Sequence, residues 1–349
     1  MIVNNEDFKK KLGYLGMAIS KNVASKQSEK MVKFDCIDGI VYAYTSDGVN
    51  NIRVEIGPSD KDFYAVVDYA TIATFVKSCE GDITLVTTDK FLQIKSSNVK
   101  CKIPTYNHEL KRTTDAIPDP VKKYNYDKQL TNPIDLKMIK SMLDPNHVVE
   151  VYQKVYFGDC IMVSDTDNVI KKETRVFDKD ILLDLSSIEI INVCSNLWYT
   201  YDNSTKTELL CIKSDELYAT LAITNNDNND FQYEDFLDLY NAVNGPTVVL
   251  DTTVLSKAIN ASSMFKTNPI IVFNPKGIFV QIDAVEFIYK ISDEVCQDRQ
   301  FELSTKLTKL ISTLGKDVVV YFTNPDLIKC KVDDMESILS IVEVPSIGK

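Results

Sequence analysis

The two histidines are the first residues to consider for catalysis, because histidine exchanges protons readily near neutral pH. They are His108 and His147, which lie 39 residues apart in predicted loops. Nothing in this spacing indicates a metal pair or an acid–base pair. The glycine motifs that cradle phosphates and the G-x-S-x-G nucleophile elbow are absent from the sequence. We therefore predict no catalytic residue, no metal and no cofactor, and a protein that is not an enzyme.

Cysteine is the other residue type that could form a reactive or metal-binding site. The chain has eight cysteines, and no two of them form a C-x-x-C pair. Several lie in apolar runs, so we expect reduced, buried thiols in a cytosolic protein. The sequence also lacks an apolar stretch of about 18 residues, and we predict no membrane span and no membrane partner.

Lysine is the residue type whose placement indicates a ligand. The chain has a net charge of −11. Its six predicted helices nevertheless hold twelve lysines and only six acidic residues, a charge of +6 that leaves −17 for the rest. These helices are predicted at residues 6–21, 68–77, 135–143, 187–197, 251–266 and 303–316. Basic helices in an acidic chain favour a surface that faces a polyanion, since lysine makes loose, exchangeable contacts with phosphates. Ordinary solvated helix faces are the alternative.

Three sets of landmarks repeat along the chain at a spacing of 118 residues. They are Asp47, Asp165 and Asp283; Lys95, Lys213 and Lys331; and Asp68, Ser186 and Ser304. A repeat of this length indicates copies of one domain rather than the short units of a solenoid. We predict a first copy at residues 1–113, a linker at 114–130, a second copy at 131–243 and a third at 244–349.

Each copy has the same predicted order of elements. An amphipathic helix comes first, such as that at residues 6–21, and a strand pair follows, such as that at 270–282. A further strand leads into a second helix, for which Asp68, Ser186 and Ser304 are suitable N-caps. More strands close each copy. The predicted fold class is α+β, with three tandem copies of a two-helix, antiparallel-sheet domain.

This arrangement resembles the bacterial-type DNA sliding clamp, the β subunit and processivity factor of DNA polymerase III. The resemblance covers nearly the whole chain and depends on order, spacing and triplication, without a single distinctive motif. It is carried by the N-terminal helix Phe8–Ser20, the segments Tyr44–Gly48 and Val163–Asp165, and the apolar-proline ending Ser340–Pro345. The sequence does not distinguish a cellular clamp from one encoded by a phage.

The resemblance implies a homodimeric ring, with helices around a central hole and sheets outside. Such a ring would hold double-stranded DNA non-specifically, by topology, and would tether the replicative DNA polymerase after a clamp loader has placed it on DNA. The DNA-facing residues expected are Lys9, Lys10, Lys21, Lys26, Lys77, Lys137, Lys140, Lys257, Lys306 and Lys309.

The resemblance also implies a peptide pocket and a contact between subunits. The pocket residues would be Thr166, Val169, Leu239, Val344, Pro345 and Ile347. The subunit contact would join Cys101 and Ile103 on one side to Met264 on the other. Ordinary core or interface packing is the alternative for both sets. The family has Gly-His-Arg where this chain has Thr166–Asn168, so its peptide preference is expected to differ.

A second function stays open at this stage. The chain would then be a non-enzymatic, β-rich structural or virion assembly protein built of duplicated domains. Retention on circular DNA but not on linear DNA would distinguish a clamp from such a protein.

Overall fold

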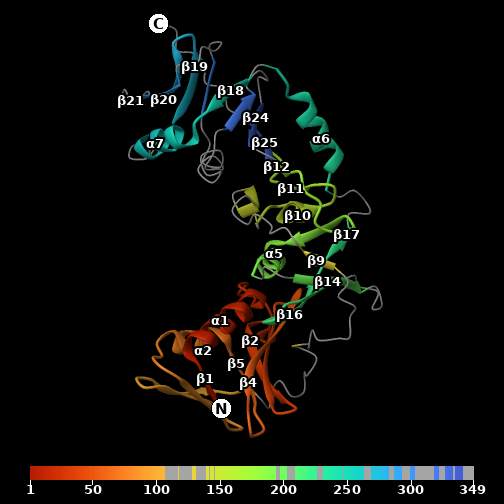
Figure 1. The fold of residues 1–349 in the computed structure, drawn as a ribbon, viewed down its shortest axis with the longest axis vertical. Coiled ribbons are helices and arrows are strands. Elements are labelled where there is room, and N and C mark those ends of the chain that lie inside the picture. Colours follow the sequence, from red (N-terminus) through yellow and green to blue (C-terminus); the bar gives the residue numbers. More distant parts are fainter. Residues whose placement is uncertain are drawn as a thin grey trace. The chain divides into compact units, whose positions relative to one another are not determined.

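The computed structural model describes most of the 349 residues. The described residues are 1–106, 117, 128–130, 139–140, 142–144, 146–193, 197–202, 209–225, 231–245, 247–262, 269–282, 287–292, 299–302, 318–321, 327–332 and 335–340. The chain divides into two compact units (Figure 1). Unit 1 is Met1–Ile134 with Ser186–Thr224, and unit 2 is Asp135–Leu185 with Asn225–Lys349. These two units do not correspond to the three predicted copies, and the division into three copies stays a prediction.

Unit 1 contains two antiparallel sheets. The larger runs in the order β5 (Tyr64–Asp68), β2 (Met31–Ile37), β3 (Ile40–Ser46), β4 (Asn50–Pro58), β16 (Leu217–Ala222), β15 (Leu209–Lys213), β14 (Leu197–Asp202) and β9 (Lys128–Leu130). The smaller runs in the order β1 (Ile2–Val3), β6 (Ile83–Thr87), β7 (Phe91–Lys95) and β8 (Lys100–Pro104). Helices α1 (Asn5–Leu15) and α2 (Tyr69–Lys77) pack against each other in this unit.

Unit 2 repeats this architecture. Its larger sheet runs in the order β17 (Thr224–Asn225), β13 (Ile181–Asp184), β10 (Lys154–Phe157), β11 (Ile161–Ser164), β12 (Asn168–Lys172), β25 (Met335–Ser340), β24 (Leu327–Val332), β23 (Val318–Tyr321) and β18 (Thr247–Leu250). Its smaller sheet runs in the order β21 (Phe287–Ser292), β20 (Gly277–Ile282), β19 (Ile270–Asn274) and β22 (Arg299–Glu302). Helices α6 (Tyr233–Ala242) and α7 (Thr252–Ser262) also lie in unit 2, whereas α5 (Leu185–Ile191) belongs to unit 1 apart from its first residue.

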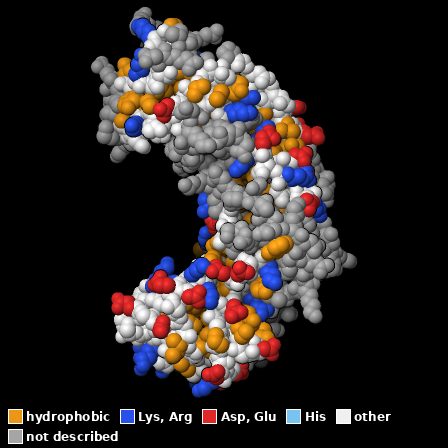
Figure 2. Space-filling view, viewed as in Figure 1, with side chains coloured by type: hydrophobic (Ala, Val, Ile, Leu, Met, Phe, Trp, Pro, Cys, Tyr) orange, Lys and Arg blue, Asp and Glu red, His pale blue; other side chains and the backbone are white. Residues whose placement is uncertain are grey.

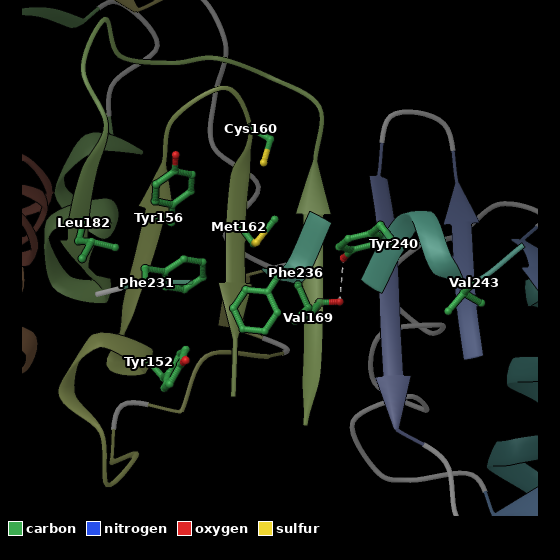
Figure 3. Close-up of a cluster of buried hydrophobic side chains, with 10 residues drawn as sticks. All are labelled: Tyr152, Tyr156, Cys160, Met162, Val169, Leu182, Phe231, Phe236, Tyr240 and Val243. Atoms are coloured by element: carbon green, nitrogen blue, oxygen red, sulfur yellow. Dashed lines mark hydrogen bonds between the residues drawn. The ribbon is translucent and has the colours of Figure 1, made fainter. Parts of the chain in front are cut away.

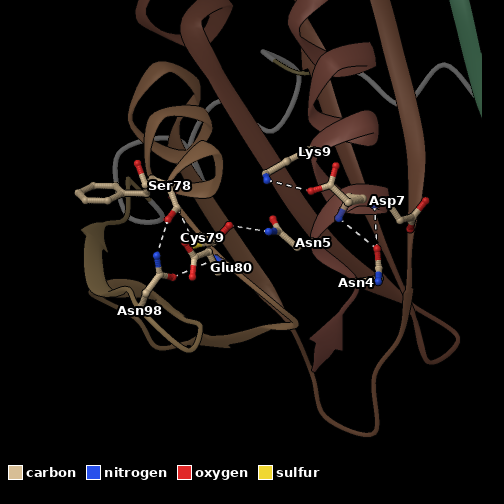
Figure 4. Close-up of polar contacts among 10 residues, drawn as sticks. Asn4, Asn5, Asp7, Lys9, Ser78, Cys79, Glu80 and Asn98 are labelled. Carbon is tan, nitrogen blue, oxygen red and sulfur yellow. Dashed lines mark hydrogen bonds and ion pairs between the residues drawn. The ribbon is translucent and has the colours of Figure 1, made fainter.

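The core of unit 1 forms where α1 covers the sheet. Phe8 and Leu12 are buried because residues four apart share one face of a helix. The Phe8 ring lies 6.4 Å from that of Phe34 on β2, and burial of such a side chain stabilises the fold by about 1.5–3 kcal/mol. At the start of α1, the Asn4 side chain accepts from the backbone N–H groups of Glu6 and Asp7, which is an N-cap (Figure 4).

The first predicted helix is shorter than expected. It was predicted over residues 6–21, but α1 ends at Leu15 and a 3₁₀ turn follows at Gly16–Ala18. Gly16 lies against the hydroxyl of Tyr69, so close that a Cβ atom at this position would clash. That hydroxyl donates to Leu12 O at 2.8 Å. The chain therefore leaves the helix at the residue that lies against Tyr69 of α2.

Two other expectations about helices were wrong. Helix α5 begins at Leu185, so Ser186 lies inside the helix and is not its N-cap. Helix α6 was not predicted at all, although it lies inside the predicted second copy. Acidic residues alternate in it with an apolar stripe at Phe236, Tyr240 and Val243. These three residues are buried, and their spacing of four and three residues is typical of a helix. Asp68, by contrast, caps α2 as predicted, with its carboxylate accepting from Thr71 N at 2.7 Å.

Candidate nucleic-acid interface and peptide site

The lysines of α1 are paired with acidic side chains. Lys9 lies 3.0 Å from Glu6, one turn earlier, and Lys11 lies 2.6 Å from Asp7. Such pairs on a helix surface contribute only about 0.3–0.5 kcal/mol, and salt screens them. These lysines can therefore exchange a carboxylate for a phosphate at little energetic cost.

Lys10 has a partner far away in the sequence. Its ammonium group contacts the carboxylate of Glu216, in the turn before β16, and the hydroxyl of Tyr14 donates to the same carboxylate. The hydrogen bond to Glu216 raises the pKa of Lys10, and the hydrogen bonds from Lys10 and Tyr14 lower the pKa of Glu216. The carboxylate of Glu216 would therefore compete with a phosphate for Lys10, one of the expected DNA-facing lysines.

Three more of the expected DNA-facing lysines lie on described segments with exposed side chains. Lys77 is in the last turn of α2, Lys257 is in the middle of α7, and Lys140 follows the buried Ile139. On the face shown in Figure 2, basic and acidic side chains are interspersed over unit 1. A positive surface would therefore have to be confined to the helices, as the charge count predicts.

Two expected lysines are not on an α-helix. Lys21 lies in the segment after α1, and Lys26 precedes the 3₁₀ turn Gln27–Lys30; both are exposed. The predicted helix ran to residue 21, so the placement of Lys21 on it was wrong. Three others, Lys137, Lys306 and Lys309, lie outside the described residues.

The repeated aspartates form the same turn in two places. The side chain of Asp47, after β3, accepts from the backbone N–H groups of Val49 and Asn50. The side chain of Asp165, after β11, accepts likewise from Asp167 and Asn168. The residue after each aspartate has a positive φ, 89° at Gly48 and 76° at Thr166. The 118-residue spacing therefore corresponds to one repeated piece of structure.

Thr166, Val169 and Leu239 are the three expected pocket residues that the structure describes. Thr166 is exposed in the turn, and Val169 on β12 is almost fully buried, with 3% exposure. Leu239 on α6 is 39% exposed. The hydroxyl of the next residue, Tyr240, donates to Val169 O at 3.1 Å, which fastens α6 to β12 (Figure 3).

Two buried lysines, Lys329 and Lys171, contact Tyr240. The ammonium group of Lys329 on β24 donates to Tyr240 O at 3.0 Å, in the last turn of α6. The ammonium group of Lys171 on β12 lies 4.9 Å from the centre of the Tyr240 ring, and 2.7 Å from Glu173. A cation at a helix C-terminus interacts favourably with the helix dipole. Sequence reasoning missed Tyr240, Lys171 and Lys329, although the apolar stripe of α6 could have indicated Tyr240.

A cluster of buried aromatic side chains packs against α6 and β12. The Tyr156 and Phe231 rings stack at 5.4 Å, and Phe236 of α6 packs 5.5 Å from Phe231 (Figure 3). Burial raises the pKa of Tyr233 and that of the Cys160 thiol to about 12, so both groups stay protonated at neutral pH. The candidate peptide site thus consists of a buried cluster of apolar and aromatic side chains, above which Leu239 of α6 is exposed.

The remaining site predictions are placed as follows. Cys101 and Ile103 lie on β8, the last strand of its sheet, where Cys101 is half-buried and Ile103 is buried. The other expected pocket and contact residues lie outside the described part of the chain; they are Val344, Pro345, Ile347 and Met264.

Comparison with protein-family models and with curated proteins finds no match for the sequence. Comparison with solved structures finds matches over the whole chain. The Helicobacter pylori β clamp bound to a DNA ligase peptide gives a TM-score of 0.74 at 13% identity, covering 98% of this chain and 99% of that chain. The DNA polymerase III β subunit of Thermotoga maritima gives 0.76 at 12% identity, covering 98% and 99%. The chain has the fold of the bacterial β clamp.

A third structure extends the comparison. The β subunit of Borrelia burgdorferi in complex with a natural product gives a TM-score of 0.75 at 12% identity, covering 99% of both chains. The predicted α+β clamp fold is therefore confirmed, and so is the resemblance to the β clamp. Among the described helices of this β-clamp fold, none has the length and apolar character needed to cross a membrane.

Proposed function

We propose that the chain is a DNA sliding clamp. Two copies would form a ring around double-stranded DNA, held by topology, and the ring would tether the replicative DNA polymerase. A clamp loader would open and close it. The chain would carry out no reaction itself, because a tether acts by raising the local concentration of its partner.

The observation that carries this proposal is the full-length likeness to β clamps, at TM-scores of 0.74 to 0.76. The exposed lysines Lys10, Lys77 and Lys257 on α1, α2 and α7 support it, whereas α6, which was not predicted, carries only acidic charges. The alternative of a structural or assembly protein is not favoured, because the solved structures that match over nearly the whole chain are β clamps.

The expected phosphate contacts are weak and exchangeable. Lys9, Lys10 and Lys11 are each paired with a different carboxylate, so a phosphate would replace one acceptor with another. Contacts of this kind let a protein move along DNA, and they carry no base readout. Sliding would therefore follow from the pairing of these lysines.

Charge reversal on the helices tests the proposal. The triple variant Lys9→Glu, Lys77→Glu, Lys257→Glu should lose retention on nicked circular DNA after loading, as measured by gel filtration of the complex. The matched control reverses Lys61, Lys90 and Lys276, which are exposed in loops, and changes the net charge equally. Equal loss in both variants, or equal retention of the unmodified protein on linear and circular DNA, would contradict the proposal.

We also propose that the surface formed by β12 and α6 receives a short apolar segment of partner proteins. The H. pylori clamp was solved with a DNA ligase peptide, which makes that peptide a practical probe. The exposed Leu239 supports this assignment, because an apolar ligand can pack against an exposed apolar side chain. The neighbouring Tyr240 holds α6 in place through its hydrogen bond to Val169 O.

A further inference from the structure

Cationic and aromatic side chains alternate across the larger sheet of unit 1. Along the strand order β2, β3, β4, β16, β15 and β14, the residues directly opposite one another are, in turn, Lys33, Tyr44, Arg53, Tyr218, Lys213 and Trp198. Directly opposite residues of neighbouring antiparallel strands project from the same face of a sheet. These six residues therefore form one row, which we call the cation–aromatic row.

The cations of this row lie over its rings. The ammonium group of Lys213 is 5.6 Å from the centre of the Tyr218 ring. The guanidinium group of Arg53 is 5.6 Å from the centre of the Tyr44 ring and 3.6 Å from that of Tyr42. Distances within about 6 Å are those of cation–π contacts. The rings and the positive charges therefore form one connected surface.

The row is covered at one end and open at the other. Tyr44 is 1% exposed and belongs to a buried cluster. Arg53 and Tyr218 are half-buried, Lys213 is exposed and Trp198 is 42% exposed. These last four residues are the open part of the row, where two aromatic rings and two cations reach solvent together.

The corresponding row of unit 2 has no such alternation. Along β12, β25, β24 and β23, the residues directly opposite one another are Lys171, Glu336, Lys331 and Val319. Lys331 lies 118 positions after Lys213. A glutamate and a valine thus occupy the places of Tyr218 and Trp198. Because unit 2 forms the same kind of sheet without the two rings, the fold does not require them in unit 1.

Acidic residues lie beside the row rather than in it. Asp35 and Glu55 belong to the adjacent row, next to the covered end, and Asp215 is in the turn between β15 and β16. The adjacent row on the other side is uncharged and consists of Asn51, Thr220, Cys211 and Thr200. An anionic ligand that lies over the open part would therefore meet the charges of Arg53 and Lys213.

We propose that the open part of the cation–aromatic row binds single-stranded DNA. Bases would stack on the rings of Trp198 and Tyr218, and phosphates would contact Lys213 and Arg53. Proteins hold single strands in this way, with aromatic faces for the bases and cations for the backbone, and with little sequence preference. Duplex DNA would bind weakly, because its bases are already paired and stacked. That the strand is DNA rests on the proposed clamp function, whereas the site rests on the row.

Trp198 reports on this site directly, because it is the only tryptophan in the chain. A base that stacks on the indole ring should quench its fluorescence. Titration of the full-length protein with oligo(dT) should therefore quench the emission, and a duplex of the same length should not. Unchanged emission with oligo(dT), or equal quenching by the duplex, would overturn the proposal.

Substitution of Trp198 separates stacking from simple attraction of charge. Trp198→Ala should weaken binding of labelled oligo(dT) about tenfold, which corresponds to the loss of one stacked base. Trp198→Phe keeps an aromatic face and should retain most of the affinity. Fluorescence anisotropy measures binding, and thermal denaturation shows that each variant is folded. Equal affinity of Trp198→Ala and the unmodified protein would overturn the stacking role.

Lys213 has a matched control in unit 2. Lys213→Ala should lower the slope of log affinity against log salt by about 0.7, the value for one phosphate contact on a single strand. Lys331→Ala makes the same change at the exposed counterpart, and it should leave affinity and slope unchanged. Equal effects of the two variants would show general attraction to the chain rather than binding at the row.

The variant with Lys9→Glu, Lys77→Glu and Lys257→Glu distinguishes this site from the proposed clamp function. It should lose retention on circular DNA but keep the quenching of Trp198 by oligo(dT), whereas Trp198→Ala should keep retention. Loss of quenching in the triple variant would place the single strand at the helices and overturn the site. Stronger quenching by oligo(U) than by oligo(dT) would overturn the assignment to DNA. Quenching by the H. pylori DNA ligase peptide alone would assign the row to a protein segment instead.

Discussion

The Ser187 hydroxyl donates a hydrogen bond to Asn50 Oδ1 at 2.8 Å, although 137 residues separate the two in the chain. The Asn50 Nδ2 group donates in turn to the Ser186 hydroxyl at 3.0 Å. Asn50 and Ser187 are both fully buried. The turn after β3 is therefore fastened to the start of α5 by one amide side chain.

Asn50→Ala should destabilise the protein by about 1–3 kcal/mol, because it leaves the buried Ser187 hydroxyl without its acceptor. Chemical denaturation would measure this change. The double variant with Ser187→Ala should cost less than the sum of the two single changes, since both remove the same hydrogen bond. Simple additivity would show that the two residues do not act together. Asn22→Ala, in an exposed loop, is the control.

Gly16→Ala should lower the melting temperature, because the new Cβ atom would push away the Tyr69 hydroxyl and break its bond to Leu12 O. Gly13→Ala is the matched control. Nothing lies within 4 Å of a Cβ atom at Gly13, which is inside α1, so this change should stabilise by about 0.5–1 kcal/mol. Opposite signs at the two glycines are expected, and equal signs would contradict the close approach of α2.

Thr166→Gly should stabilise the protein by about 1 kcal/mol. Thr166 has a φ of 76°, a conformation that a β-branched residue adopts only at a cost and that glycine adopts freely. The reciprocal change, Gly48→Thr, places threonine in the equivalent turn and should destabilise by a similar amount. Urea denaturation of both variants would check the pair, and a loss of stability on Thr166→Gly would show that the hydroxyl outweighs the backbone strain.

Leu239→Ala and Tyr240→Phe should separate binding from stability. Leu239 is substantially exposed, so its truncation should change the free energy of unfolding by less than about 0.5 kcal/mol while weakening binding of the H. pylori DNA ligase peptide. Tyr240→Phe removes the donor to Val169 O and should cost about 1 kcal/mol of stability. Fluorescence anisotropy and thermal denaturation measure the two effects. Unchanged peptide affinity for Leu239→Ala would place the peptide elsewhere.

Glu216→Gln should strengthen binding to DNA at low salt, because it frees the ammonium of Lys10 from a competing carboxylate. The slope of log affinity against log salt should steepen by up to about one phosphate contact. In the unmodified protein the hydrogen bonds from Lys10 and Tyr14 lower the pKa of Glu216, so the carboxylate stays ionised and paired with Lys10 at neutral pH, and the pairing is lost only as the pH falls through the lowered pKa. DNA affinity that does not respond to Glu216→Gln would remove Lys10 from the DNA-facing set.

The sequence predicted those interactions that join residues close together in the chain. Asp47 and Asp165 were predicted as equivalent, and both accept from the asparagine three residues later. The pairing of Lys10 with Glu216 was not predictable, because it joins residues 206 positions apart. Helix α6 was missed although its sequence carries two signals, the acidic residues Glu234 and Asp235 in its first turn and buried apolar residues at helical spacing.

The pairing of β4 with β16 and that of β12 with β25 form two internal junctions with one register, in which Ile52 is opposite Ala219 and Ile170 is opposite Ser337. A half-sheet taken from one junction fits the complementary half of the other, because the spacing of backbone groups and the isoleucine against a small residue are the same at both. Gain or loss of a whole copy through unequal recombination would thus leave compatible edges at the new joint. The number of copies per chain can therefore vary in evolution without any new strand contact having to arise.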